Sequence, residues 1–139
     1  MSGPTALPDR RDGTIDTAIL QPMVWKPDVT VAAVVERDGH FLFVEERASG
    51  RVVLNQPAGH LDPGETLQHA VARETLEETG WTFVPREIVG VYLWQSTTTA
   101  RTFLRIAFCG NLGGHDPTRP LDQGILRTRW LDREQMLAL

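Results

Sequence analysis

The sequence has few of the features that mark particular classes of protein. Cys109 is the only cysteine among 139 residues, so no disulfide can form within the chain, as is common in a reducing compartment. The 14 Lys and Arg residues are outnumbered by 18 Asp and Glu residues. The resulting net charge of −4 offers no basic excess for binding a nucleic acid polymer.

Long hydrophobic runs are also missing. The longest apolar stretch, residues 31–35, is far too short to cross a membrane. The charged residues 9–12 lie where the apolar run of a signal peptide would be. The composition therefore predicts a cytoplasmic protein without membrane contact.

The length suits one domain, preceded by a segment of different character. Residues 1–26 are rich in proline and glycine and show little periodicity, which predicts a mobile N-terminal extension before a domain at residues 27–139. Apolar residues of the extension, among them Met23, Val24 and Trp25, could pack on a second subunit. Both a monomer and a homodimer therefore remain open.

The domain alternates between strand-like and helix-like patterns. A turn at Asp38-Gly39 predicts a hairpin, and loops are expected at residues 56–64 and 110–120. Strands are predicted at residues 29–36, 41–45, 52–54, 89–95, 102–109 and 126–131. Helices are predicted at residues 67–79 and from Arg133, where the chain stops, so that a longer parent protein is possible. Several strands with few helices indicate an α/β or α+β fold.

The helix predicted at residues 67–79 has an unusual apolar face. Thr66 is a candidate N-cap, and Gly80 lies where a left-handed residue often ends a helix. At about 100° per residue, the stripe that starts at Leu67, Ala70 and Val71 continues into Glu74 and Glu78, with Glu77 about 60° to one side. The stripe that should meet the core therefore ends in carboxylates.

Two interpretations of these carboxylates are open. A solvated charged face is the simpler one, although the acids continue the buried stripe instead of opposing it. The other is a divalent cation site, because three like charges within one turn repel each other and Mg²⁺ prefers oxygen ligands. The preceding loop supports a cation site: Gly59 permits a close backbone approach, and Glu65 could form an ion pair with Arg73 that fixes the loop.

These residues resemble a known motif, the Nudix box. Gly59, five residues, Glu65, seven residues and then residues 73–81 supply each fixed position of the 23-residue pattern. Thr75 and Trp81 stand where the family has aliphatic residues, a departure that concerns packing. The resemblance covers residues 27–139 in outline and implies an α/β fold, an α/β/α sandwich with a mixed central sheet.

The resemblance also implies a chemistry. Members of the Nudix family are hydrolases of phosphorus-containing acid anhydrides in small phosphorylated metabolites. It implies that Glu74, Glu77 and Glu78 bind Mg²⁺, for which Mn²⁺ can substitute, with the Gly59 carbonyl as a further ligand. A metal-activated water would then attack phosphorus.

A narrower resemblance, to a phosphatase subgroup of the family, depends on four further segments: residues 26–32, 44–46, 55–61 and 103–105. This subgroup releases phosphate from nucleoside di- and triphosphates. It also acts on hydroxymethylpyrimidine diphosphate and thiamine diphosphate. The resemblance extends these substrates to the present chain as an expectation.

Several residues outside the motif are candidate substrate contacts. Arg105 interrupts an apolar strand and could bind a phosphate, or else form a structural ion pair. Tyr92 and Trp94 share a strand face and could stack on a flat ring, or belong to the core. His60 is either a substrate contact or a solvated loop residue. Glu45 or Glu46 could add a metal ligand.

The general base is left open between residues of two kinds. Many Nudix enzymes carry a further glutamate about six residues before the tryptophan of the last strand, but Gly124 takes that place relative to Trp130. Asp122 is nearby and could accept a proton. A box carboxylate, Glu77 or Glu78, is the other candidate, since a metal lowers the pKa of its bound water.

Three alternatives compete with a phosphate-releasing hydrolase. One is a nucleotide-pool sanitiser that releases pyrophosphate from oxidised dNTPs, as MutT-like enzymes do. Another is a non-catalytic Nudix module that binds a nucleotide, although such modules usually lack one of the box carboxylates. The last is a structural protein with an acidic helix face.

Overall fold

Strand β1 (Asp28–Val34) lies inside the larger of two sheets in the computed structural model, which describes residues 23–139. It pairs in parallel with β7 (Thr102–His115) and antiparallel with β5 (Ala58–His60). Strand β6 (Trp81–Gln95) pairs antiparallel with β7 and completes the order β5-β1-β7-β6. The α/β class and the mixed sheet are therefore confirmed.

A second sheet is built around β3 (His40–Ala48). It pairs with β2 (Glu36–Arg37), β4 (Arg51–Asn55) and β8 (Ile125–Asp132), in each case antiparallel. The short helix α3 (Arg133–Leu137) follows β8 directly. Glu45 of β3 forms ion pairs with Arg127 and Arg129 of β8, which hold the two strands together from the face opposite the core residues Leu42 and Val44.

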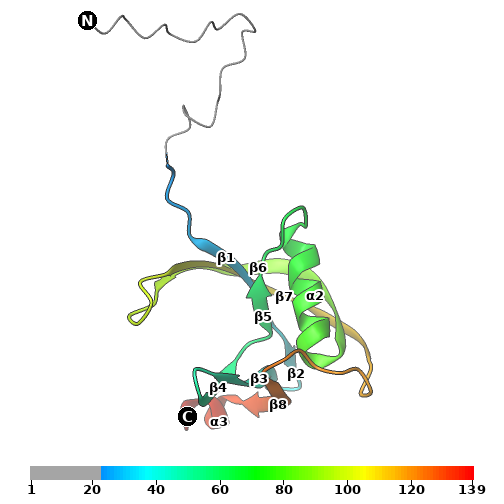
Figure 1. The fold of residues 1–139 in the computed structure, drawn as a ribbon. Coiled ribbons are helices and arrows are strands. Elements are labelled where there is room, and N and C mark those ends of the chain that lie inside the picture. The colour runs from blue at the N-terminus through cyan, green and yellow to red at the C-terminus, as the bar shows by residue number, and fades with distance from the viewer. Residues whose placement is uncertain (1–22) are drawn as a thin grey trace, which may run out of the picture.

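Helix α2 (Leu67–Thr79) has the predicted bounds and both predicted caps. The Thr66 side chain accepts a hydrogen bond from the His69 amide at 3.1 Å, and Gly80 adopts a left-handed conformation with φ 74°. The helix contacts β1, β5, β6 and β8, so it lies between the two sheets (Figure 1). Its buried residues are Ala70, Val71, Glu74, Thr75, Glu78 and Thr79. The apolar stripe therefore does continue into two carboxylates.

The core lies between α2 and the strands. Its buried residues are Val31, Ala33, Val35, Leu42, Ala70, Val71, Phe83, Ile106 and Phe108. Trp81 and Trp130 pack against this cluster, as expected for packing residues. Thr75, the departure from the aliphatic pattern, is fully buried and donates a hydrogen bond to the Val71 carbonyl at 2.7 Å. This internal bond satisfies the hydroxyl that an aliphatic residue would not carry.

The two longest strands extend beyond their predicted bounds. Strand β6 begins at Trp81 instead of residue 89, and β7 continues to His115 through part of the predicted loop. Their pairing shifts register at three places, one of them between Pro85 and Glu87 and another between Ile88 and Gly90. Proline and glycine interrupt the alternating pattern but are tolerated at the bulges of an edge strand. Strand β5, inside a predicted loop, is only three residues long.

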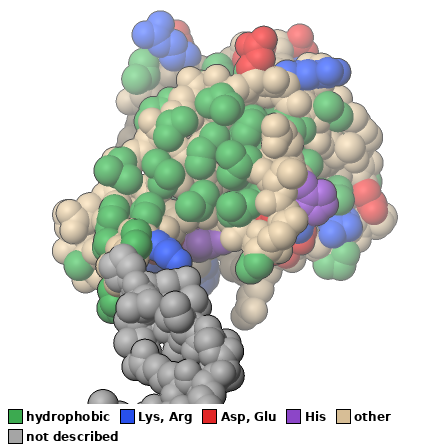
Figure 2. All heavy atoms as spheres, turned by 90° about the horizontal axis from the view of Figure 1, so that it is seen from above, with side chains coloured by type: hydrophobic (Ala, Val, Ile, Leu, Met, Phe, Trp, Pro, Cys, Tyr) green, Lys and Arg blue, Asp and Glu red, His purple; other side chains and the backbone are tan. Residues whose placement is uncertain are grey.

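Hydrophobic side chains gather on the face of the molecule shown in Figure 2. Strand β6 is rich in exposed hydrophobic residues, among them Val91 and Leu93 with 59% and 68% of their surface exposed. These two residues pair with Ile106 and Leu104, so they share the sheet face that packs on the core. The apolar face of the sheet therefore extends beyond the part that the core covers.

The predicted N-terminal extension falls mostly on residues 1–22, which lie outside the described residues. Residues 23–26 form no helix or strand and are exposed. Within residues 23–139, no helix is both long enough and apolar enough to span a bilayer.

Replacement of Gly80 tests the end of α2. Alanine at this position would adopt an unfavourable positive φ, and its Cβ would lie 2.6 Å from the Asp116 carbonyl oxygen. We expect Gly80→Ala to lower the free energy of unfolding by at least about 2 kcal/mol, from strain and overlap together. Gly39→Ala is the matched control, because Gly39 has φ 76° but open space around it. If chemical denaturation showed that both variants lose the same free energy of unfolding, the overlap of the new Cβ with Asp116 would contribute nothing.

Candidate active site

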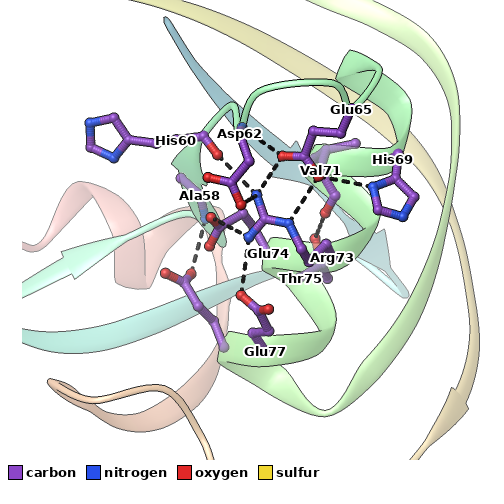
Figure 3. A network of polar contacts seen from close by, with 11 residues as sticks. Ala58, His60, Asp62, Glu65, His69, Val71, Arg73, Glu74, Thr75 and Glu77 are labelled. Carbon is purple, nitrogen blue, oxygen red and sulfur yellow. Dashed lines mark hydrogen bonds and ion pairs between the residues drawn. The ribbon is translucent and has the colours of Figure 1, made fainter. Parts of the chain in front are cut away.

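Arg73 of α2 connects the loop before the helix with the carboxylates of the helix (Figure 3). Its guanidinium donates two hydrogen bonds to Glu65, at 2.6 and 3.0 Å, and one to the His60 carbonyl at 3.0 Å. The same group donates to Glu74 at 2.9 Å and to Glu77 at 3.2 Å. Residues 60–65 are thus fixed against the first turns of the helix.

The Glu65 carboxylate is held in its ionised form by this network. Hydrogen bonds lower the pKa of Glu65 to about 2. Those from Arg73 have the largest effect, and the one from the Asp62 amide, at 2.8 Å, adds to it. The Glu65 and Glu74 carboxylates in turn raise the pKa of Arg73 above its usual value. The ion pair therefore stays charged throughout the neutral range.

Gly59 passes directly beside the Glu74 carboxylate. A Cβ added at this position would overlap the Glu74 carboxylate, so a larger residue here would displace the Glu74 side chain. Glu74 is buried, and this burial raises its pKa although Arg73 opposes the shift. The backbone of β5 and the carboxylate of α2 thus share one small space.

Glu78 lies deeper along the same helix face. Only 7% of its surface is exposed, and its carboxylate accepts a hydrogen bond from the Ala58 amide at 3.0 Å. Burial raises the pKa of Glu78 to about 8, and the nearby carboxylates of Glu74, Glu46 and Asp122 add to the effect. A positive charge placed here would compensate both the burial and the repulsion.

Oxygen atoms suited to a divalent cation converge where α2 meets the loop before β8. Glu74, Glu77 and Asp122 each offer one carboxylate oxygen, and the three atoms lie within 4.8 Å of one another. The Asp122 amide also donates to the Glu77 carbonyl at 3.0 Å, which ties the loop before β8 to α2. A set of only oxygen donors fits a hard cation of the Mg²⁺ or Ca²⁺ type.

A cavity of about 670 Å³ opens beside these carboxylates. Residues of three transverse rows line it or form its floor, because directly paired residues of adjacent strands face the same side. The middle row runs from His60 through Thr30 and Arg105 to Tyr92. A row of small residues lies on one side of it, namely Ala58, Ala32, Ala107 and Gly90, and a row with Phe103 and Trp94 lies on the other.

Arg105 is the only cation among the residues that line this cavity. Among residues 23–139, no carboxylate lies within ion-pair distance of it, and it donates one long hydrogen bond, 3.4 Å, to the Asn55 side chain. Burial lowers the pKa of Arg105, while the more distant Glu46 and Glu78 oppose the shift. This half-buried guanidinium retains free donors that point to an anion as ligand.

Aromatic side chains form the opposite wall of the cavity. Trp94 stacks on Phe103 with ring centroids 5.4 Å apart, and His60 meets Phe103 edge-on at 6.4 Å. Trp94 has 60% of its surface exposed and Tyr92 has 52%. These two residues therefore do not belong to the core and present free ring surface to a ligand.

The structure brings most of the predicted site residues together. Those that line the cavity are Gly59, His60, Glu74, Glu78, Trp94 and Arg105. Glu77 and Asp122 lie in the adjoining carboxylate cluster. Of the two glutamates at the end of β3, Glu45 pairs with arginines of β8, and only Glu46 lines the cavity.

Four residues of the cavity were missed by sequence reasoning: Thr30, Asn55, Ala58 and Phe103. Thr30 and Phe103 share a strand face with other candidates, so strand periodicity could have suggested them once the pairing was known. Asn55 ends the short strand β4 and gave no local signal. Its place in the cavity depends on how the second sheet meets the first.

Comparisons with known proteins agree with this geometry. The model of the NUDIX domain family matches residues 26–139. The phosphatase NudJ of Escherichia coli K12 is 43% identical over 114 residues, which cover 82% of this chain and 74% of that protein. The narrower resemblance in the sequence is to the same phosphatase.

Solved structures give the same result. A NUDIX hydrolase from Nitrosomonas europaea superposes with a TM-score of 0.80 at 47% identity, over 81% of this chain and 77% of that one. The MutT protein from Methanosarcina mazei Go1 superposes with a TM-score of 0.69 at 29% identity, over 84% and 85%. This chain therefore belongs to the Nudix hydrolase family, whose members hydrolyse phosphorus-containing acid anhydrides.

Proposed function

We propose that this enzyme is a Mg²⁺-dependent hydrolase that releases phosphate from a nucleoside di- or triphosphate, or from a pyrimidine or thiamine diphosphate. The observation that carries the proposal is one continuous cavity with three kinds of group. It has carboxylates of α2 at one side, an aromatic wall at the other, and Arg105 between them. These groups match such a substrate. The carboxylates suit a metal ion bound to the diphosphate, Arg105 suits the negative charge of a phosphate, and the aromatic wall suits a flat ring.

Glu74, Glu77 and Glu78 would hold the cation, with the Gly59 carbonyl as a further ligand. The convergence of Glu74 and Glu77 with Asp122 supports this assignment and adds Asp122 to the set. Mg²⁺ retains several waters and is commonly bridged to substrate phosphates; Mn²⁺ can take its place. The bound ion would supply an activated water and compensate charge on the leaving phosphate.

The residue that receives the proton of this water lies among the same carboxylates. Glu78 is buried and its carboxylate accepts a hydrogen bond from the Ala58 amide. We therefore assign it as a cation ligand and not as the general base. Glu77 is half-buried at the edge of the cluster, and we assign it as the general base. Asp122, which contacts the same helix turn through its amide, is the alternative.

Binding of the rest of the substrate falls to three residues. Arg105 would bind a phosphate oxygen, since its guanidinium has free donors inside the cavity. Trp94 would stack on the ring of the substrate, and His60 would border it beside Phe103. The phosphatase activity in the name of NudJ supports release of phosphate. The MutT protein supports the second candidate, release of pyrophosphate from a nucleoside triphosphate.

A substrate panel with Mg²⁺ distinguishes these candidates by their products. The assay measures free phosphate and pyrophosphate separately. We expect phosphate from nucleoside diphosphates, hydroxymethylpyrimidine diphosphate or thiamine diphosphate, and little pyrophosphate from oxidised dGTP. Pyrophosphate as the main product would replace the proposal by a MutT-like sanitiser. Tight binding of a nucleotide without turnover would instead indicate a non-catalytic module.

Replacement of Glu77 tests the cation site and the base. We expect Glu77→Gln to lower kcat at least about 100-fold without loss of the fold, because a proton acceptor and a metal ligand are removed together. Glu87→Gln is the matched control, since Glu87 is an exposed residue of β6 that lines no part of the cavity. Activity within a few-fold of the wild type would contradict the assignment of Glu77.

The pH dependence of stability tests the burial of Glu78. The pKa of about 8 in the folded chain lies above the usual 4.5, so between these values the folded state binds more protons than the unfolded state. When a chelator keeps the protein free of metal, the free energy of unfolding should therefore fall as pH rises from 5 to 8. The slope should be up to about 1.4 kcal/mol per pH unit. Glu78→Gln should flatten this slope in thermal or chemical unfolding, whereas Glu87→Gln should keep it. A wild-type slope equal to that of Glu78→Gln would refute the shift.

A further inference from the structure

Glu46 is a carboxylate in the cavity wall that the proposed mechanism does not use. It is half-buried, and its Oε1 accepts a hydrogen bond from the Asn55 side chain at 3.2 Å. Within residues 23–139, no basic side chain lies within ion-pair distance of it. A fixed negative charge in a cavity for an anionic substrate weakens binding unless it contacts a donor.

The neighbouring residue, Glu45, has the structural role at this end of β3. Glu45 forms ion pairs with Arg127 and Arg129 and thereby joins β3 to β8. Because successive residues of a strand face opposite sides, Glu46 points away from this pair and into the cavity. The pairing of β3 with β8 does not need it.

The converging oxygens of the cation site belong to Glu74, Glu77 and Asp122. Glu46 is not among them, although its charge helps to raise the pKa of Glu78. Its hydrogen bond leads instead to Asn55, whose side-chain oxygen Oδ1 accepts the hydrogen bond from Arg105. Asn55 thus fixes an acceptor, Glu46, and a donor, Arg105, at a set spacing on one side of the cavity.

The position of Arg105 shows which part of a ligand these groups would meet. Arg105 pairs with Tyr92 on one side and with Thr30 on the other, so it lies between the aromatic strand and the strand next to the carboxylates. Glu46, held through Asn55 beside Arg105, therefore lines the part of the cavity that leads from the carboxylates of α2 to the aromatic wall.

We propose that Glu46 is a specificity-determining residue that accepts a hydrogen bond from an exocyclic amino group on the heteroaromatic ring of the substrate. The proposal depends on the proposed function and narrows it to rings with a donor at this edge. A carbonyl at the same place would leave the carboxylate unpaired and would be repelled by it. A site that expects a donor discriminates strongly against analogues without one.

Cytidine and uridine diphosphate provide a matched test, because their rings differ in an amino group against a carbonyl at one position. We expect the wild type to favour CDP over UDP at least about tenfold in kcat/KM with Mg²⁺. Glu46→Gln should bring the ratio close to one, since its amide can donate as well as accept. Glu45→Gln, the adjacent residue on the other strand face, should leave the ratio at the wild-type value.

The possible outcomes separate the two proposals. Turnover of neither diphosphate, nor of any other member of the substrate panel, would refute the proposed function itself. Turnover of both with a ratio that Glu46→Gln leaves unchanged would overturn the role of Glu46 alone. A shift in the Mg²⁺ concentration needed for half-maximal activity at an unchanged ratio would also overturn it, in favour of a metal ligand.

A second variant keeps the test valid if Glu46→Gln does not fold, as judged by circular dichroism. Glu46→Asp retains the charge but withdraws the carboxylate by one methylene group. We expect it to reduce the preference for CDP while UDP turnover changes little. A preference equal to that of the wild type would overturn the proposal.

Discussion

Glu74 and Glu77 of α2 and the loop residue Asp122 converge on one point, where Arg73 donates hydrogen bonds to both glutamates. Arg73 is already committed to Glu65, to which it donates two of its hydrogen bonds. Burial and mutual repulsion therefore remain uncompensated deeper in the helix, where the pKa of Glu78 is raised to about 8. The attraction of this site for a cation follows from that imbalance, and the loop, the helix and β5 are arranged to maintain it.

The larger sheet converts this local feature into a substrate site. Its three rows of paired residues place small side chains beside the carboxylates, Arg105 in the middle and rings at the far side. A ligand with a charged end and a flat end would therefore have one favourable direction in the cavity. The second sheet contributes Asn55 and Glu46, which line the same cavity.

Local sequence was sufficient where the causes of structure are local. Helix α2 has the predicted bounds because its cap residue, its left-handed end and its apolar stripe all lie within fifteen residues. Strand β6 was predicted too short because Pro85 and Gly90 interrupt its alternation, and the partner strand that compensates for them is distant in sequence. Tyr92 and Trp94 could not be assigned between core and cavity from alternation, since both faces of that strand are apolar.

The sequence by itself determined the carboxylates, their spacing along one helix face and the glycine that lets the backbone approach them. These follow from helical geometry and from backbone sterics, which act over a few residues. Only the tertiary structure decided that Glu45 and Glu46 have different environments, that Asn55 lies between Glu46 and Arg105, and that Asp122 joins the helix carboxylates. Such neighbours are set by strand register and by how two sheets meet around a helix, and these depend on contacts between residues far apart in the chain.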